Sequence, residues 1–93
     1  MKVNTTTDLS PKEVNEIIRD RGEDKDFYIL RYDIETTEYN NRIVFKNFKD
    51  AASEFNISKP NYKNERVELM FSPEEDDLKY GDNIVLMYKE IIN

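Results

Sequence analysis

The side chains in this sequence that could do chemistry are mainly carboxylates. Asp33 and Glu35 lie two positions apart, and a second group is consecutive: Glu74, Glu75, Asp76 and Asp77. Neither group spreads its oxygens along a loop with a central glycine, as a calcium loop requires. Histidine and cysteine are absent, which removes the commonest general base and the usual transition-metal ligands. We therefore expect no catalytic residue, no metal and no cofactor, and interpret the chain as a binding protein rather than an enzyme.

The string Asp33-Ile34-Glu35-Thr36 resembles the first motif of the DEDD exonucleases, in which an Asp and a Glu bind divalent metal. That family also needs two further carboxylates on distant segments and a Tyr or His that positions the water. A chain of 93 residues is too short for that fold, and it contains no histidine. We interpret Asp33 and Glu35 as exposed side chains near the end of a strand.

Length and composition limit the possible functions further. We expect 93 residues to form one domain, 1–93, with a core too limited for a deep catalytic cleft. No segment approaches the roughly 18 apolar residues that span a bilayer, and residues 1–7 lack the apolar stretch of a secretory signal. These features predict a cytoplasmic protein without membrane contact. The abundance of Asn, Lys, Glu and Ile is typical of an AT-rich genome, such as that of a phage or a low-GC bacterium.

Capping signals and hydrophobic periodicity predict an α+β fold. Ser10, Pro11 and Glu13 form a capping box that starts a helix over 11–21. Tyr28, Leu30 and Tyr32 alternate on one side of a half-buried strand. The predicted elements after the first helix are strands at 27–34 and 43–45, a helix from Asn47 to Asn56, a short helical turn at 58–60, a strand at 66–71, one or two helical turns after Ser72, and a strand at 84–88. The order α-β-β-α-β-(α)-β predicts a small antiparallel sheet of about four strands with helices packed on it.

The acidic balance gives the main functional hypothesis. The net charge is −6, and the carboxylates concentrate in segments 8–38 and 74–82. If they project from one face, they could occupy a cleft built for phosphates. We therefore predict a protein-binding module whose partner presents a basic surface, such as a nucleic-acid-binding protein. A sharper form is a phage-type inhibitor that mimics DNA. The predicted acidic contact residues are Glu23, Asp24, Asp26, Glu35, Glu38, Glu74, Glu75, Asp76 and Asp77.

Residues 31–64 support an alternative. A predicted hairpin is followed by a helix with Ala51-Ala52, a turn, and Ile57-Ser58. This pattern resembles the modular helix-turn-helix-type DNA-binding repeats of phage homing endonucleases. The resemblance implies a DNA-binding module that uses the basic segment 45–63, although Pro60 departs from the pattern by interrupting the second helix. The implied DNA contacts are Lys49, Ser58, Lys59, Asn61, Tyr62 and Lys63. The negative charge of the rest of the chain opposes binding to phosphate.

A third possibility is an accessory or structural phage protein. Such a protein could form a homodimer through a sheet edge or through exposed tyrosines. Tyr39, Tyr62 and Tyr80 fall in predicted turns, where an exposed tyrosine is a good contact residue. Most other aromatic residues, among them Tyr28, are expected in the core.

Overall fold

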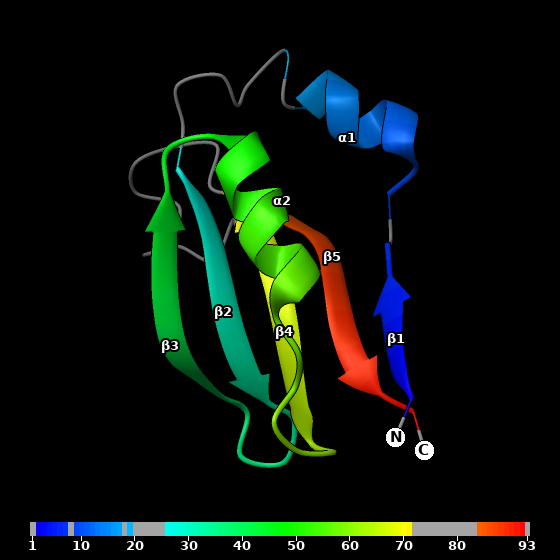
Figure 1. The fold of residues 1–93 in the computed structure, drawn as a ribbon, viewed down its shortest axis with the longest axis vertical. Coiled ribbons are helices and arrows are strands. Elements are labelled where there is room, and N and C mark those ends of the chain that lie inside the picture. The colour runs from blue at the N-terminus through cyan, green and yellow to red at the C-terminus, as the bar shows by residue number, and fades with distance from the viewer. Residues whose placement is uncertain (1, 8, 18, 20–25, 72–83, 93) are drawn as a thin grey trace.

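The described residues form a five-stranded antiparallel sheet with two helices, so the predicted α+β class is confirmed. The computed structural model describes residues 2–7, 9–17, 19, 26–71 and 84–92. The elements in chain order are β1 (Val3–Thr6), α1 (Pro11–Ile17), β2 (Phe27–Asp33), β3 (Glu38–Phe45), α2 (Phe48–Ile57), β4 (Glu65–Phe71) and β5 (Ile84–Ile91). The strands lie in the order β1-β5-β4-β2-β3, and every neighbouring pair is antiparallel (Figure 1).

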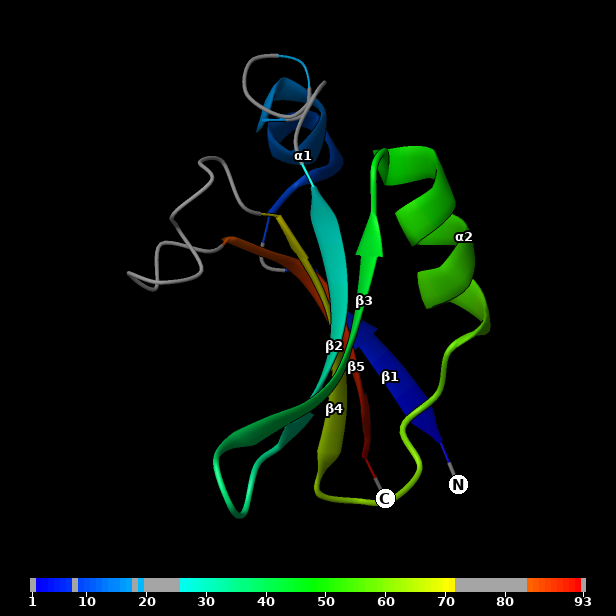
Figure 2. The same cartoon turned by 90° about the vertical axis from the view of Figure 1, so that its left-hand side faces the viewer.

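The two faces of the sheet differ in what covers them. α2 lies along one face and packs on β2, β4 and β3, whereas α1 lies at one end of the sheet (Figure 2). Neither described helix covers the opposite face. Because side chains alternate along a strand, one set of residues from β2 and β4 points toward α2. The core on this side consists of Phe27, Ile29, Ala51, Phe55, Val67, Leu69, Phe71 and Leu86.

Tyr28 is buried, as the sequence predicts, but it does not belong to the main core. Tyr28 and Leu30 lie on the face away from α2, where they form a smaller buried cluster with Met70. The α2 side takes Phe27 and Ile29 instead. All four residues at the start of β2 are buried, so alternation alone does not identify the covered side there.

α2 is positioned by its cap and by two residues one helical turn apart. The Asn47 side chain accepts a hydrogen bond from the Asp50 backbone N–H at 2.8 Å, which satisfies a free donor of the first turn. Ala51 and Phe55 are fully buried against the sheet, and the small Ala51 lets the helix approach closely. The predicted start of this helix is therefore confirmed.

α1 also begins as predicted. The Ser10 hydroxyl accepts from the Glu13 N–H at 3.1 Å, and the Glu13 carboxylate accepts from the Ser10 N–H at 3.3 Å. These reciprocal bonds are the capping box expected from the sequence. Among the described residues, neither helix is long and apolar enough to cross a membrane.

Three elements differ from prediction or lie beyond the described part. β1 was not predicted, because its Asn and Thr side chains carry no apolar alternation; it joins the sheet through pairing with β5. The helical turn predicted at 58–60 is wrong. Ser58 is extended, and Pro60 disfavours helical backbone at Lys59, so residues 58–64 form a loop. The helical turns predicted after Ser72 lie outside the described residues.

Candidate functional site

The described acidic candidates do not gather in one place but lie at opposite ends of β2. Asp26 precedes β2 and accepts a hydrogen bond from Lys46 at 2.9 Å. Glu35 and Glu38 lie at the other end of β2, in and just after the turn to β3. A seven-residue strand spans roughly 23 Å, so Asp26 is far from this pair. The remaining candidates lie outside the described residues: Glu23, Asp24, Glu74, Glu75, Asp76 and Asp77.

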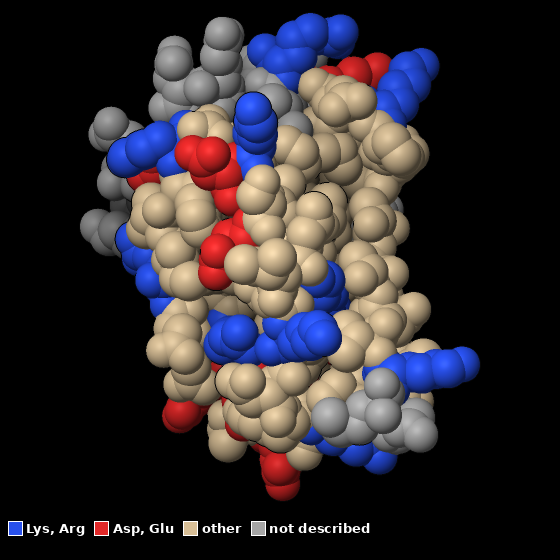
Figure 3. Space-filling view, viewed as in Figure 1, with Lys and Arg blue, Asp and Glu red and all other residues tan. Residues whose placement is uncertain are grey.

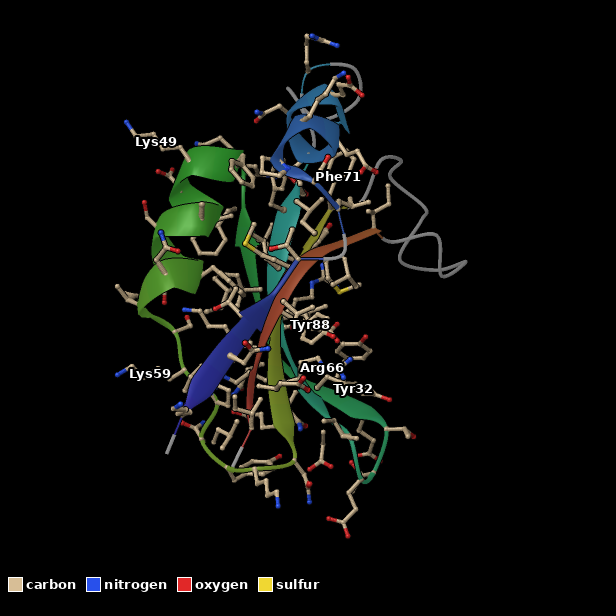
Figure 4. The ribbon with its side chains drawn as sticks, turned by 90° about the vertical axis from the view of Figure 1, so that its right-hand side faces the viewer. Tyr32, Lys49, Lys59, Arg66, Phe71 and Tyr88 are labelled. Atoms are coloured by element: carbon tan, nitrogen blue, oxygen red, sulfur yellow. The ribbon has the colours of Figure 1, made fainter. Side chains whose placement is uncertain are left out.

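The residues implied by the DNA-binding resemblance are distributed over two ends of α2. Lys49 lies near the start of the helix and Lys59 beyond its end (Figure 4). Ser58 is buried, and its hydroxyl donates to the Glu54 carbonyl at 2.7 Å, so it closes the helix. Asn61, Tyr62 and Lys63 lie in the following loop. Basic side chains do gather near the C-terminal end of α2 (Figure 3), but the described segment supplies no second helix to enter a groove.

Asp33 and Glu35 organise two neighbouring loops. One Asp33 oxygen accepts the N–H groups of Glu35 and Thr36, both at 2.9 Å, and the other accepts the Tyr62 hydroxyl at 2.7 Å. These hydrogen bonds, the Thr36 N–H first, lower the pKa of Asp33. Glu35 accepts from the Asn64 amide at 3.1 Å. Both carboxylates therefore hold the β2–β3 turn against the loop before β4. No group of Asp, Glu, His or Cys within the described residues is arranged to bind a metal.

The face of the sheet opposite α2 carries most of the tyrosines. We call it the tyrosine face. The strand register places side by side Tyr28 and Tyr32 of β2, Tyr39 and Arg42 of β3, Arg66 and Glu68 of β4, and Tyr88 of β5, and Glu90 of β5 joins them through its contact with Arg66. Tyr32, Arg66 and Tyr88 project to the side away from α2 (Figure 4). Side chains from four strands thus form one continuous surface.

Aromatic and charged groups on this face hold one another in place. The Arg66 guanidinium stacks on the Tyr88 ring at 4.2 Å and lies 3.7 Å from Glu68 and 3.6 Å from Glu90. Arg42 lies over the Tyr28 ring at 4.8 Å. Each guanidinium therefore lies over the face of an aromatic ring, a position that favours a cation–π contact.

Tyr39 is the most exposed tyrosine of the face. Tyr39 is 51% exposed, and its ring packs against the Tyr32 ring with the two centroids 4.7 Å apart. Its hydroxyl donates to a Glu68 carboxylate oxygen at 3.0 Å. Partial burial and the charge of Glu68 raise the pKa of Tyr39 to about 12, and burial of its carboxyl raises the pKa of Glu68.

We expect the protein to lose stability as pH rises from about 10 to about 12. Folded Tyr39 keeps its proton up to about 12, whereas an ordinary tyrosine titrates near 10.0. The folded state then binds more protons than the unfolded state, so the free energy of unfolding falls with rising pH. Urea midpoints measured across this range should show the fall. Tyr39→Phe should make it shallower, and an unchanged slope in this variant would contradict the assignment.

Two polar contacts on the α2 side were not visible in the sequence. The Lys89 ammonium donates to the backbone carbonyls of Phe55, Asn56 and Ser58 at 2.6, 3.1 and 3.0 Å. Burial and the charge of Lys59 lower the pKa of Lys89. Arg31 and Glu65 form an ion pair at 2.6 Å beneath the 58–64 loop. Both contacts position the chain that follows α2.

The outer edge of β3 carries a feature that opposes pairing with a second sheet. Between Leu30 and Arg31 the β2–β3 register shifts by one residue, which leaves Asn41 unpaired with φ of 53°. A bulge of this kind twists an edge strand and disrupts its regular row of donors and acceptors. The tyrosine face is therefore a better candidate for an interface than this edge.

The tyrosine face could have been found only partly from sequence. Alternation places Tyr28 and Tyr32 on one side of their strand, but the strand register is needed to set Arg66 and Tyr88 beside them. No family model, curated protein or solved structure matches this chain. The function is therefore inferred from the chemistry of its surface.

Proposed function

We propose that this chain is a non-catalytic binding module that recognises another protein through the tyrosine face. The observation that carries the proposal is the gathering of Tyr32, Tyr39, Tyr88 and two arginines on a sheet face that neither described helix covers. Tyrosine and arginine are enriched at the energetic centres of protein interfaces, because they combine a large contact area with a polar end.

The order within the face supports the same proposal. Tyr39 is held by Tyr32 and Glu68. Arg66 is held by the Tyr88 ring and by the carboxylates of Glu68 and Glu90. Side chains that are already fixed lose little conformational entropy when a partner docks. The face therefore has the rigidity of a preorganised interface.

A protein partner fits the charges better than nucleic acid does. Arg42 and Arg66 share the face with Glu68 and Glu90, so the surface has no excess of positive charge. The whole chain carries a net charge of −6, which opposes the phosphate contacts that dominate nucleic-acid affinity. The same net charge favours a partner with a basic surface, and it is the support for the more specific proposal of a nucleic-acid mimic.

Comparative capture tests the proposal. Immobilised wild-type protein and a Tyr39→Ala variant are incubated with the same cell extract, and the bound proteins are quantified. We expect at least one protein to bind the wild type about tenfold better, since an interface tyrosine commonly contributes more than ~1.4 kcal/mol.

Tyr62→Ala is the matched control. Tyr62 is 42% exposed and its hydroxyl also donates to a carboxylate, that of Asp33, but it lies in the loop before β4 rather than on the tyrosine face. Capture should survive this change. If no captured protein depends on Tyr39, or if both variants lose the same proteins, the tyrosine face is not the interface.

A further inference from the structure

The Tyr39 ring is prepared to receive a ligand group. Tyr32 supports it at 4.7 Å, and the hydrogen bond to Glu68 at 3.0 Å fixes its orientation. Half of the residue remains exposed, at 51%. Donating a hydrogen bond to a carboxylate also makes the phenol ring more electron-rich, which strengthens its attraction for a cation.

The charges around this ring leave a negative excess. The Arg66 guanidinium supplies the positive charge on this part of the tyrosine face, and it lies between the carboxylates of Glu68 and Glu90. Its contacts of 3.7 and 3.6 Å are longer than direct charge-assisted hydrogen bonds, so neither carboxylate is saturated by it. Arg42 is directed toward Tyr28, further from the β2–β3 turn than Tyr39, and Glu38 pairs with Asp33 and so projects from the other face of the sheet.

The tyrosine face already binds guanidinium groups of its own chain. Arg42 on Tyr28 and Arg66 on Tyr88 are two cases of a cation over a tyrosine ring, at 4.8 and 4.2 Å. Tyr39 is the more exposed residue, and its hydroxyl bonds to the Glu68 carboxylate. Its surroundings are therefore complementary to a third cation supplied from outside.

We infer that a basic side chain of a protein partner, arginine or lysine, docks on the exposed Tyr39 ring, on the face of the sheet that also carries the half-buried carboxylate of Glu90 and the buried one of Glu68. This inference rests on the proposed function and names the chemistry of the partner. Arginine fits better than lysine, since its planar guanidinium stacks on an aromatic ring while its N–H groups reach a neighbouring carboxylate.

Defined ligands test the inference on the intact chain. Backbone amide resonances are followed by NMR while four probes are added separately: a glycine-rich peptide with two arginines, the same peptide with lysines, the same peptide with glutamates, and a short oligothymidylate. We expect the arginine peptide to shift the resonances of Tyr39, Tyr88 and Glu90 saturably. Added salt should weaken this binding.

Matched variants assign the contact. Tyr39→Leu and Glu90→Gln should each weaken arginine-peptide binding about threefold to fivefold, the range of a partly exposed cation–π contact or ion pair. Tyr62→Leu and Glu54→Gln remove the same groups elsewhere, on the loop before β4 and on α2, and should leave the affinity unchanged. The amide spectra themselves report whether each variant is folded.

The outcomes separate this inference from the proposed function. Preference for the glutamate peptide at the same resonances would overturn the cationic partner but support a protein interface. Preference for oligothymidylate would overturn both. If no peptide shifts the face while Tyr39-dependent capture of a protein persists, only the inference about the basic side chain fails.

Discussion

Replacing Lys89 by Met is expected to lower the free energy of unfolding by about 3 kcal/mol, because three backbone carbonyls lose their charged donor. The Lys89 ammonium lies 2.6, 3.1 and 3.0 Å from the carbonyl oxygens of Phe55, Asn56 and Ser58. The last carbonyls of an α-helix have no partner within the helix. Lys89 supplies these partners from β5, so it fastens the C-terminal end of α2 to the sheet.

Methionine isolates the contribution of the ammonium group. It keeps a long apolar side chain against the Phe55 ring, over which the Lys89 nitrogen lies at 4.7 Å. Burial opposes the charge, as the lowered pKa of Lys89 indicates, and the carbonyl dipoles of the helix end offset this cost. With an m-value typical of a small domain, the urea midpoint should fall by about 2 M.

Lys59→Met is the matched control. Lys59 is exposed and lies within the 58–64 loop that follows α2, so its replacement should change stability by less than about 0.5 kcal/mol. Lys89→Arg should recover part of the loss, because it restores a cationic donor at the helix end. Equal urea midpoints for Lys89→Met and Lys59→Met would show that the ammonium does not cap α2.

The starts of both helices were predictable because their signals are local. Ser10 with Glu13, and Asn47 with the residues after it, satisfy free N–H groups within one turn of the chain. Such contacts depend on neighbours in sequence, so they appear in a pattern of residue types. The strands at 27–33 and 65–71 were found for a similar reason, since both are rich in apolar and aromatic residues.

The arrangement of the strands was not predictable in the same way. β1 is recognised only through its partner, because Val3 pairs with Ile91 at the far end of the chain. The side of β2 that meets α2 also depends on tertiary packing: Phe27 and Tyr28 are both buried, on opposite faces. Alternation therefore located the strand but did not identify which of its two faces meets α2.

The candidate site illustrates the same limit. Counting charges drew attention to acidic segments, but charge in sequence carries no information about a shared face, and Asp26 proves remote from Glu35 and Glu38. The tyrosine face joins residues from Tyr28 to Glu90 through the register of four strands. A surface assembled by strand pairing becomes visible only when the sheet order is known.

Replacing Glu65 by Leu is expected to lower the free energy of unfolding by about 3 kcal/mol and to release the 58–64 loop from the sheet. Glu65 is 4% exposed and accepts hydrogen bonds from Arg31 at 2.6 Å and from the Asn61 backbone N–H at 2.8 Å. Arg31 also donates to the Lys59 carbonyl at 2.9 Å. The pair therefore holds both halves of the loop, and removing one partner leaves the other charge uncompensated. Urea denaturation measures the cost, and hydrogen exchange should show lost protection at Asn61.

A double-mutant cycle separates the ion pair from simple packing. The cost of Glu65→Leu should be smaller in an Arg31→Met background by about 2 kcal/mol, since the unpaired guanidinium is then gone. The Arg31 side chain is 20% exposed, so hydration limits the penalty for leaving it unpaired. Glu38→Leu, at an exposed position of β3, should stay within about 0.5 kcal/mol of wild type. Strictly additive effects of the Arg31 and Glu65 changes would show that Glu65 acts on the loop independently of Arg31.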